Sequence, residues 1–177
     1  GIYQQVTGLP ANQVFGTGTY LDTARLKRSL GDALNVDPRS IQGYMLGEHG
    51  DSQFAAWSTV RVLGQKADEL VTNYHLDLDA VANDARVGGF TVFSGKKYTN
   101  FAIAHAAVSL AQLVLSDAHN EAIVSHYDAR FAGYISTPAI IGRSGVVANF
   151  ELTLTADEQR ALQQSANAIA EKTAAYL

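Results

Sequence analysis

Apolar residues recur at helical spacing in several separate segments of this 177-residue chain. Leu26, Leu30 and Leu34 are four residues apart, so they share one side of a helix. That helix is expected to begin after the glycine-rich segment 16–19 and to end before Pro38, because proline disfavours helical backbone in the preceding residue. Further helices are expected over residues 1–8, 67–74, 78–93, 99–118 and 155–176.

Short segments rich in β-branched and aromatic residues predict strands between these helices. Segments 42–46 and 55–62 are expected to pair antiparallel. Segments 134–141 and 145–150 flank a Gly-Arg-Ser-Gly turn and predict a second antiparallel pair, and 122–127 is a further short strand. The chain is therefore predicted to be an α+β domain, with long helices packed on small antiparallel sheets.

Two of the predicted helices have unusual compositions. Segment 99–118 is apolar on nearly every side, which predicts a buried central helix with His105 as a satisfied core residue. Segment 78–93 contains Gly88 and Gly89, which are expected to loosen its centre, and a turn is expected over 94–97. The remaining histidines outside the glycine-flanked turn are expected to face solvent, namely His75, His119 and His126.

The composition is that of an ordinary globular domain, with 47% apolar and 17% charged residues. The net charge of −4 and the absence of a Lys/Arg stripe argue against a nucleic-acid partner. There is no cysteine, which suits a cytoplasmic location. The longest apolar run, residues 101–115, contains His, Ser and Gln and is too short and polar to span a bilayer, so no membrane partner is expected.

The first candidate for chemistry is the acid–base pair Asp22 and Arg25. They are three residues apart, so they share a face of the helix, and Thr19 precedes Asp22 as in a capping box. Alone, this pair is most simply an intrahelical ion pair on a solvated surface.

The second candidate is His49, which stands between Gly47 and Gly50 after a predicted strand. Glycines let the backbone turn sharply and expose the imidazole, which can give and take a proton near neutral pH. Alone, such a histidine is usually only a turn residue. Glu48 and Asp51 flank it, but their spacing matches no metal-ligand pattern, and no metal is expected.

Together, the segments LDTAR at 21–25 and LGEHGD at 46–51 are far more specific than either alone. They resemble the carboxy-terminal half of the L-lactate/L-malate dehydrogenase family, and most closely the L-2-hydroxyisocaproate and L-lactate dehydrogenases of lactobacilli. The resemblance extends over essentially the whole chain. Further matching segments are AWS at 56–58, ARVGGFTV at 85–92, GKKYT at 95–99 and PAIIG at 138–142.

The resemblance implies an NAD-dependent L-2-hydroxyacid dehydrogenase, which interconverts a 2-hydroxy acid and a 2-oxo acid. By matching positions, His49 would be the general acid/base, and Asp22 would orient and stabilise its imidazole. Arg25 would bind the substrate carboxylate, and Thr99 would face the substrate. Malate dehydrogenase is the alternative within the family.

The resemblance also implies a division of the enzyme between this chain and an upstream half. Residues 1–177 are expected to form the single C-terminal substrate domain, because Met45 is the only methionine and no Gly-x-Gly-x-x-Gly segment follows a strand. NAD would be bound mainly by the missing Rossmann half. Alone, the chain is expected to be catalytically silent and to self-associate as a homo-oligomer, a dimer or tetramer, with a two-fold contact.

Four positions depart from the family pattern. Lys27 and Gln42 stand where bisphosphate-activated members carry Arg and His, so no such activation is expected. Gly88 and Gly89 stand where lactate enzymes tend to carry alanines, and the smaller residues are expected to admit longer or branched substrates.

Overall fold

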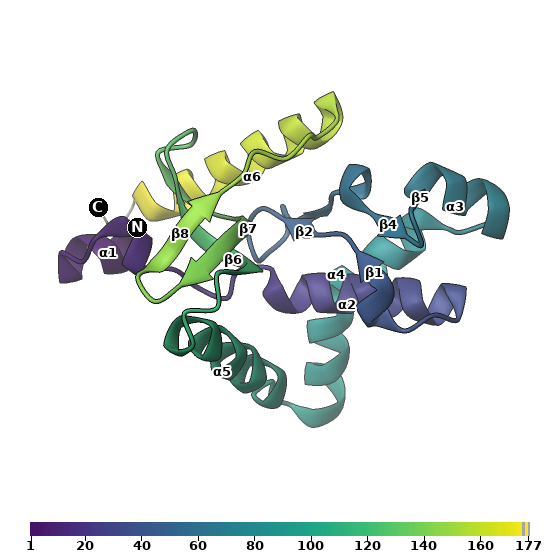
Figure 1. Cartoon of the computed structure of the whole chain (residues 1–177), viewed down its shortest axis with the longest axis horizontal. Coiled ribbons are helices and arrows are strands. Elements are labelled where there is room, and N and C mark those ends of the chain that lie inside the picture. The colour runs from purple at the N-terminus through teal and green to yellow at the C-terminus, as the bar shows by residue number, and fades with distance from the viewer. Residues whose placement is uncertain (175, 177) are drawn as a thin grey trace.

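The structure is a computed structural model that describes residues 1–174 and 176. Its elements follow the α+β class expected from the sequence, with helices packed on antiparallel sheets (Figure 1). The α-helices are α1 (Ile2–Thr7), α2 (Tyr20–Leu34), α3 (Ala67–Tyr74), α4 (Leu78–Lys96), α5 (Phe101–Leu115) and α6 (Ala156–Ala174). The short 3-10 helices are η1 (Ala11–Gln13), η2 (Pro38–Ser40) and η3 (Trp57–Thr59).

The strands form three small antiparallel sheets. The largest has the order β6-β7-β8, in which the expected hairpin of β7 and β8 is confirmed and β6 pairs with β7 along its whole length. The others have the orders β1-β4-β5 and β2-β3. The strands are β1 (Ile41–Gln42), β2 (Met45–Leu46), β3 (Phe54–Ala55), β4 (Arg61–Val62), β5 (Gln65–Lys66), β6 (Asn120–Asp128), β7 (Gly133–Gly142) and β8 (Gly145–Asn149).

The expected pairing of 42–46 with 55–62 is antiparallel, but it is divided into two ladders. β1 pairs with β4, and β2 pairs with β3. Gly43 separates β1 from β2 with φ of 143°, and a Cβ there would lie 2.8 Å from Val60 Cγ2. Glycine therefore allows both the unusual backbone and the close approach of the two segments.

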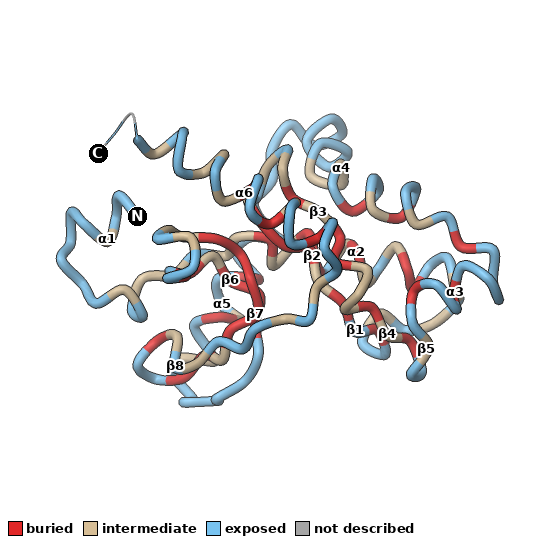
Figure 2. Tube along the Cα trace, turned by 90° about the horizontal axis from the view of Figure 1, so that it is seen from above, coloured by how far each residue is buried: buried red, intermediate tan, exposed pale blue. Residues whose placement is uncertain are grey.

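Helix α2 lies in the middle of the main hydrophobic core. Leu26 and Leu30 are fully buried against residues of β1, β2 and β4 and of helices α3 and α4. Burying a side chain of this size stabilises the fold by roughly 1.5–3 kcal/mol. Figure 2 shows the buried positions gathered where α2 meets the short strands and β7, while α1 is exposed. The first turn of α2 is thus held by a well-packed scaffold.

Helices α5 and α6 pack on the largest sheet and lie below and above it in Figure 1. Leu110 of α5 lies in a hydrophobic cluster with Ala139 and Ile141, whereas Leu162 of α6 lies in a cluster with Ile135. The start of α6 has the expected cap, because Glu158 accepts a hydrogen bond from the backbone N–H of Thr155, at 2.9 Å. The sequence predicts that this helix extends to Tyr176. The structure describes it as far as Ala174, and Ala175 lies outside the described residues.

The prediction that α5 is a buried central helix is wrong. Its buried residues are Ala106 and Leu110, whereas Phe101 and Leu115 are 70% and 78% exposed. His105 is exposed as well. An apolar composition does not specify which sides of a helix are covered within one chain, so this helix presents apolar surface outwards.

Two further predictions are corrected by the structure. Helix α4 continues without a break through both glycines and through most of the expected turn to Lys96, and is followed by Lys97, whose φ is 64°. Asp77 caps its start, and Val81 and Ala85 bury one side in the core, which outweighs the weak helix propensity of glycine. His126 is buried in β6 and does not face solvent, whereas His75 and His119 are exposed as expected.

Within residues 1–174 and 176, no helix has the length and apolar character needed to cross a membrane.

Candidate active site

Asp22 lies in the first turn of α2, and only 1% of its side chain is exposed. The segment before it is anchored to β2, since the Thr19 hydroxyl donates to the carbonyl of Met45 at 2.6 Å. Thr23 strengthens this anchor by accepting from the backbone N–H of Met45 at 3.0 Å. The expected capping box is therefore absent: Thr19 makes no side-chain cap, and its hydroxyl is used to attach the helix to the strand.

His49 lies in the loop that follows β2. Gly47 begins this loop with φ of 95°, and its backbone N–H and carbonyl pair with Ser136 of β7 at 3.1 and 3.2 Å. The imidazole Nδ1 lies 2.6 Å from Asp22 Oδ2. Because an ionised carboxylate only accepts hydrogen bonds, Nδ1 is the donor. This hydrogen bond is the main cause that raises the pKa of His49 above its ordinary value of 6.5, against the opposing effect of burial.

Arg25 occupies the other oxygen of the same carboxylate. Its Nη1 donates to Asp22 Oδ1 at 2.8 Å, and its side chain is 24% exposed. The ion pair expected from the spacing of these two residues is therefore present. It differs from an ordinary surface pair because the carboxylate is buried and is also bonded to His49.

The open side of this cluster is suited to a small anion. The side chain of His49 is 59% exposed, and its Nε2 has no hydrogen-bond partner among the described residues. The guanidinium of Arg25 carries five N–H donors, of which the described part of the chain engages only the one on Asp22. A carboxylic acid at this surface would meet a directional cation and an acid/base within a short distance of each other.

Thr99 is not brought into contact with this cluster by any hydrogen bond among the described residues. It lies exposed in the connection between α4 and α5. Among residues 1–174 and 176, no three His, Asp or Glu side chains are grouped to hold a metal ion.

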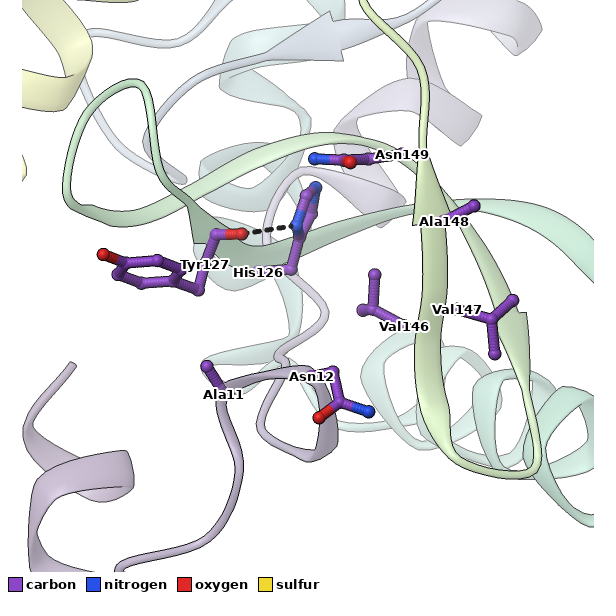
Figure 3. A pocket seen from close by; sticks show the side chains of 8 residues that line it. All are labelled: Ala11, Asn12, His126, Tyr127, Val146, Val147, Ala148 and Asn149. Carbon is purple, nitrogen blue, oxygen red and sulfur yellow. Dashed lines mark hydrogen bonds between the residues drawn. The ribbon is translucent and has the colours of Figure 1, made fainter.

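A separate cavity of about 270 Å³ lies between η1, β6 and β8, and none of the expected site residues lines it (Figure 3). His126 projects into this region, with Nδ1 3.1 Å from the carbonyl of Tyr127 and Nε2 2.8 Å from Thr137 Oγ1. Burial lowers the pKa of His126, which favours the neutral ring. Both ring nitrogens therefore have hydrogen-bond partners within the sheet, which indicates a structural role for His126.

The chain resembles known proteins in both sequence and structure. Residues 19–175 match the family model for the lactate/malate dehydrogenase alpha/beta C-terminal domain. L-lactate dehydrogenase 3 of Bacillus thuringiensis subsp. konkukian is 38% identical over 170 residues, which are 91% of this chain and 54% of that protein. L-lactate dehydrogenase 1 of Lactobacillus acidophilus is 35% identical over 174 residues, which are 94% and 54% of the two chains.

Among solved structures, the minor L-lactate dehydrogenase from Enterococcus mundtii in the ligands-bound form superposes with a TM-score of 0.89 at 32% identity. The match covers 95% of this chain and 56% of that one. The chain thus spans about half the length of the relatives that it matches. This chain belongs to the lactate/malate dehydrogenase family and has the fold of the family's C-terminal domain.

Proposed function

We propose that this chain forms the substrate-binding and acid/base half of an NAD-dependent L-2-hydroxyacid dehydrogenase, which interconverts a 2-hydroxy acid and a 2-oxo acid. One observation carries the proposal: Asp22 holds His49 on Oδ2 at 2.6 Å and Arg25 on Oδ1 at 2.8 Å. A proton donor and a carboxylate-binding group are therefore fixed on the two oxygens of one buried side chain. The family and the named L-lactate dehydrogenases among its relatives support the same reaction class.

The described residues do not themselves fit a dinucleotide. Their strands pair antiparallel throughout, whereas the Rossmann unit that binds NAD is built on a parallel sheet. NAD would therefore be bound mainly by residues outside this chain, and when bound it would supply the hydride chemistry. The side chains present here would bind the acid and move the proton.

His49 would exchange the proton through Nε2, because Nδ1 is committed to Asp22. During reduction, the imidazolium would give its Nε2 proton to the carbonyl oxygen of the 2-oxo acid. During oxidation, the neutral ring would accept the hydroxyl proton at the same nitrogen. The Asp22 carboxylate stabilises the protonated ring, so the acid form remains available near neutral pH.

Arg25 would bind the substrate carboxylate with its free N–H groups, in the planar, directional manner that lysine lacks. Thr99 is proposed to face the substrate on the strength of the family motif alone. The named relatives favour a lactate-type acid, and malate remains the alternative substrate. We also propose a cytoplasmic location, which suits a chain without cysteine.

The reaction can be tested by following NADH absorbance with a 2-oxo acid. The chain alone should not oxidise NADH, whereas a protein that joins it to a nucleotide-binding half should do so. In that protein, His49→Asn should lower kcat by about 10²–10⁴-fold, the usual contribution of general acid–base catalysis. The exposed His75 provides the matched control, since His75→Asn should leave the rate unchanged. Equal rates for the two variants would contradict the proposed role of His49.

The role of Asp22 predicts a titration effect in the chain itself. Asp22→Asn removes the charge that holds the imidazolium, so the pKa of His49 should fall towards or below 6.5, as measured by NMR titration. Asp32→Asn, at an exposed position of the same helix, should leave the pKa of His49 unchanged.

The same pairing has a consequence for folding stability. The pKa of His49 is raised in the folded state. The stabilisation of the fold that His49 gains from Asp22 is therefore complete below about pH 6.5 and is lost as pH rises through the raised pKa. Thermal unfolding at several pH values should show this loss of stability with rising pH in the parent chain and not in Asp22→Asn. The assignment fails if both proteins follow the same pH dependence.

Gly88 and Gly89 differ in their relation to Arg25. A Cβ at Gly88 would lie 2.8 Å from Arg25 Cδ, whereas one at Gly89 would lie 3.7 Å from the two Nη atoms. Gly88 therefore lets the arginine lie close to α4, while Gly89 has room for a methyl group. The expectation that these glycines admit longer substrates remains a prediction.

We expect Gly88→Ala to displace Arg25 and weaken binding of the 2-oxo acid, with KM raised about tenfold because a charged hydrogen bond is disturbed. Gly89→Ala should leave KM within about twofold and raise stability by roughly 0.5–1 kcal/mol through its better helix propensity. Both variants are to be compared by steady-state kinetics and thermal unfolding. An identical KM in the two would contradict this account of Arg25.

The exposed apolar side of α5 supports the proposed homo-oligomer. Ile103 and Val108 are exposed on this helix together with Phe101 and Leu115, and a second copy of the chain would cover them across a two-fold contact.

Val108→Glu should therefore convert the assembly to smaller species, as measured by size-exclusion chromatography with light scattering. Val71→Glu, at an exposed position of α3, should leave the mass unchanged. A parent chain that is monomeric, or a Val108→Glu variant of unchanged mass, would show that α5 is not the contact.

A further inference from the structure

The loop that carries His49 is attached to helix α6 as well as to β7. The backbone N–H of Glu48 donates to Ser165 Oγ of α6 at 2.6 Å. Helix α6 packs on β7, the strand to which Gly47 is bridged, and lies above it in Figure 1. Glu48, the residue immediately before His49, is therefore held by α6, a helix close to the C-terminus.

Ser52 closes a ring of hydrogen bonds between the loop and α6. Its Oγ donates to Glu48 Oε2 at 2.6 Å and lies 2.9 Å from Ser165 Oγ. Each hydroxyl has a single proton, and that of Ser52 is used on Glu48, so Ser165 must be the donor to Ser52. Ser165 in turn accepts from the N–H of Glu48, so every proton in the ring has one acceptor.

The fit between the loop and α6 is close. Ser165 is fully buried, and a Cβ on Gly47 would lie 2.5 Å from its hydroxyl oxygen. Glycine at position 47 therefore serves this contact as well as the positive φ of the loop. Removing the buried hydroxyl would leave the Glu48 N–H without its partner, which is costly in a buried site.

Lys172 adds a charged contact about two turns further along α6. The Nζ of Lys172 contacts Glu48 Oε1. The hydrogen bonds that Lys172 and Ser52 donate to the Glu48 carboxylate lower the pKa of Glu48. The side chain of Lys172 is 68% exposed, while that of Glu48 is largely covered. Helix α6 thus holds Glu48 at two points: Ser165 accepts from its backbone N–H, and Lys172 contacts its ionised carboxylate.

His49 has little else to hold it. Glycines stand two residues before it and directly after it, and its side chain is bonded to the rest of the described chain only through Asp22. A short loop of this kind would sample several conformations unless it were held at its base. The contacts of Glu48 supply that support.

We propose that Ser165 and Lys172 of α6 are positioning residues for His49: by fixing Glu48, they keep the imidazole at hydrogen-bonding distance from Asp22. The importance of His49 for turnover rests on the proposed function. The hydrogen bond to Asp22 exists in the chain without substrate or cofactor, so the positioning role is testable independently of activity.

The test is NMR of the His49 imidazole in the chain. The Nδ1 proton, held between nitrogen and carboxylate, should give a far-downfield resonance that exchanges slowly with water. Ser165→Ala and Lys172→Met should each speed this exchange about fivefold or more, the factor that corresponds to one lost hydrogen bond. Ser165→Ala should also move the pKa of His49 towards 6.5.

Two variants serve as controls. Lys172→Arg keeps the charge and should retain the slow exchange of the parent. Arg160→Met removes a cation from the same helix that is paired with Asp157, and should have no effect on the resonance. Parent-like exchange in both Ser165→Ala and Lys172→Met, or loss of slow exchange in Lys172→Arg, would overturn the proposal.

The exposed Lys172 keeps the test decisive if Ser165→Ala fails to fold, since Lys172→Met removes no buried group. Failure of the dehydrogenase assay would count against the proposed function and leave these NMR results intact. Unchanged NMR signals in an active enzyme would remove the positioning role and leave the proposed function intact.

Discussion

The buried carboxylate of Asp22 is the constraint on which the site depends. A negative charge removed from water must be balanced by donors within hydrogen-bonding distance, or it destabilises the fold. Here His49 and Arg25 occupy its two oxygens, and leaving such a charge unpaired would cost about 3–5 kcal/mol. Folding of this domain therefore brings together the same groups that the proposed chemistry needs, before any substrate is present.

The scaffold is arranged to hold that carboxylate still. Leu26 and Leu30 bury one side of α2, while Thr19 and Thr23 attach its first turn to β2. The loop that follows β2 is then supported from β7 and from α6. Residues that are far apart in the sequence thus converge on one short hydrogen bond. The open face of the cluster is where the proposed acid would bind.

The sequence predicts those parts of the molecule that are determined locally. The spacing of the leucines predicts α2, and the turn between β7 and β8 predicts their hairpin. The Asp22–Arg25 pair follows from helix geometry. The hydrogen bond between Asp22 and His49 could be anticipated only from resemblance to a family, because no local rule brings residues 22 and 49 together.

The predictions that the structure contradicts share one physical cause, which is tertiary packing. The exposure of α5 depends on which sides of the helix the sheet covers, and apolar composition carries no such information. Thr19 has the spacing of a capping residue, but tertiary contact with Met45 offers its hydroxyl a different acceptor. The side chain of His126 is buried in the sheet, where it bonds to Thr137 of the neighbouring strand. The α6 contacts with Glu48 join residues more than a hundred positions apart, and an isolated serine or lysine gives no signal of them.

The central claim is that Asp22 fixes His49 in one tautomer, with the proton on Nδ1 and the Nε2 lone pair available to the proposed substrate. The most direct measurement is the ¹⁵N chemical shifts of the two ring nitrogens in the chain, recorded above the pKa of His49. The account predicts a protonated Nδ1 and an unprotonated Nε2. A ring protonated on Nε2, or averaged rapidly between the two tautomers, would contradict it.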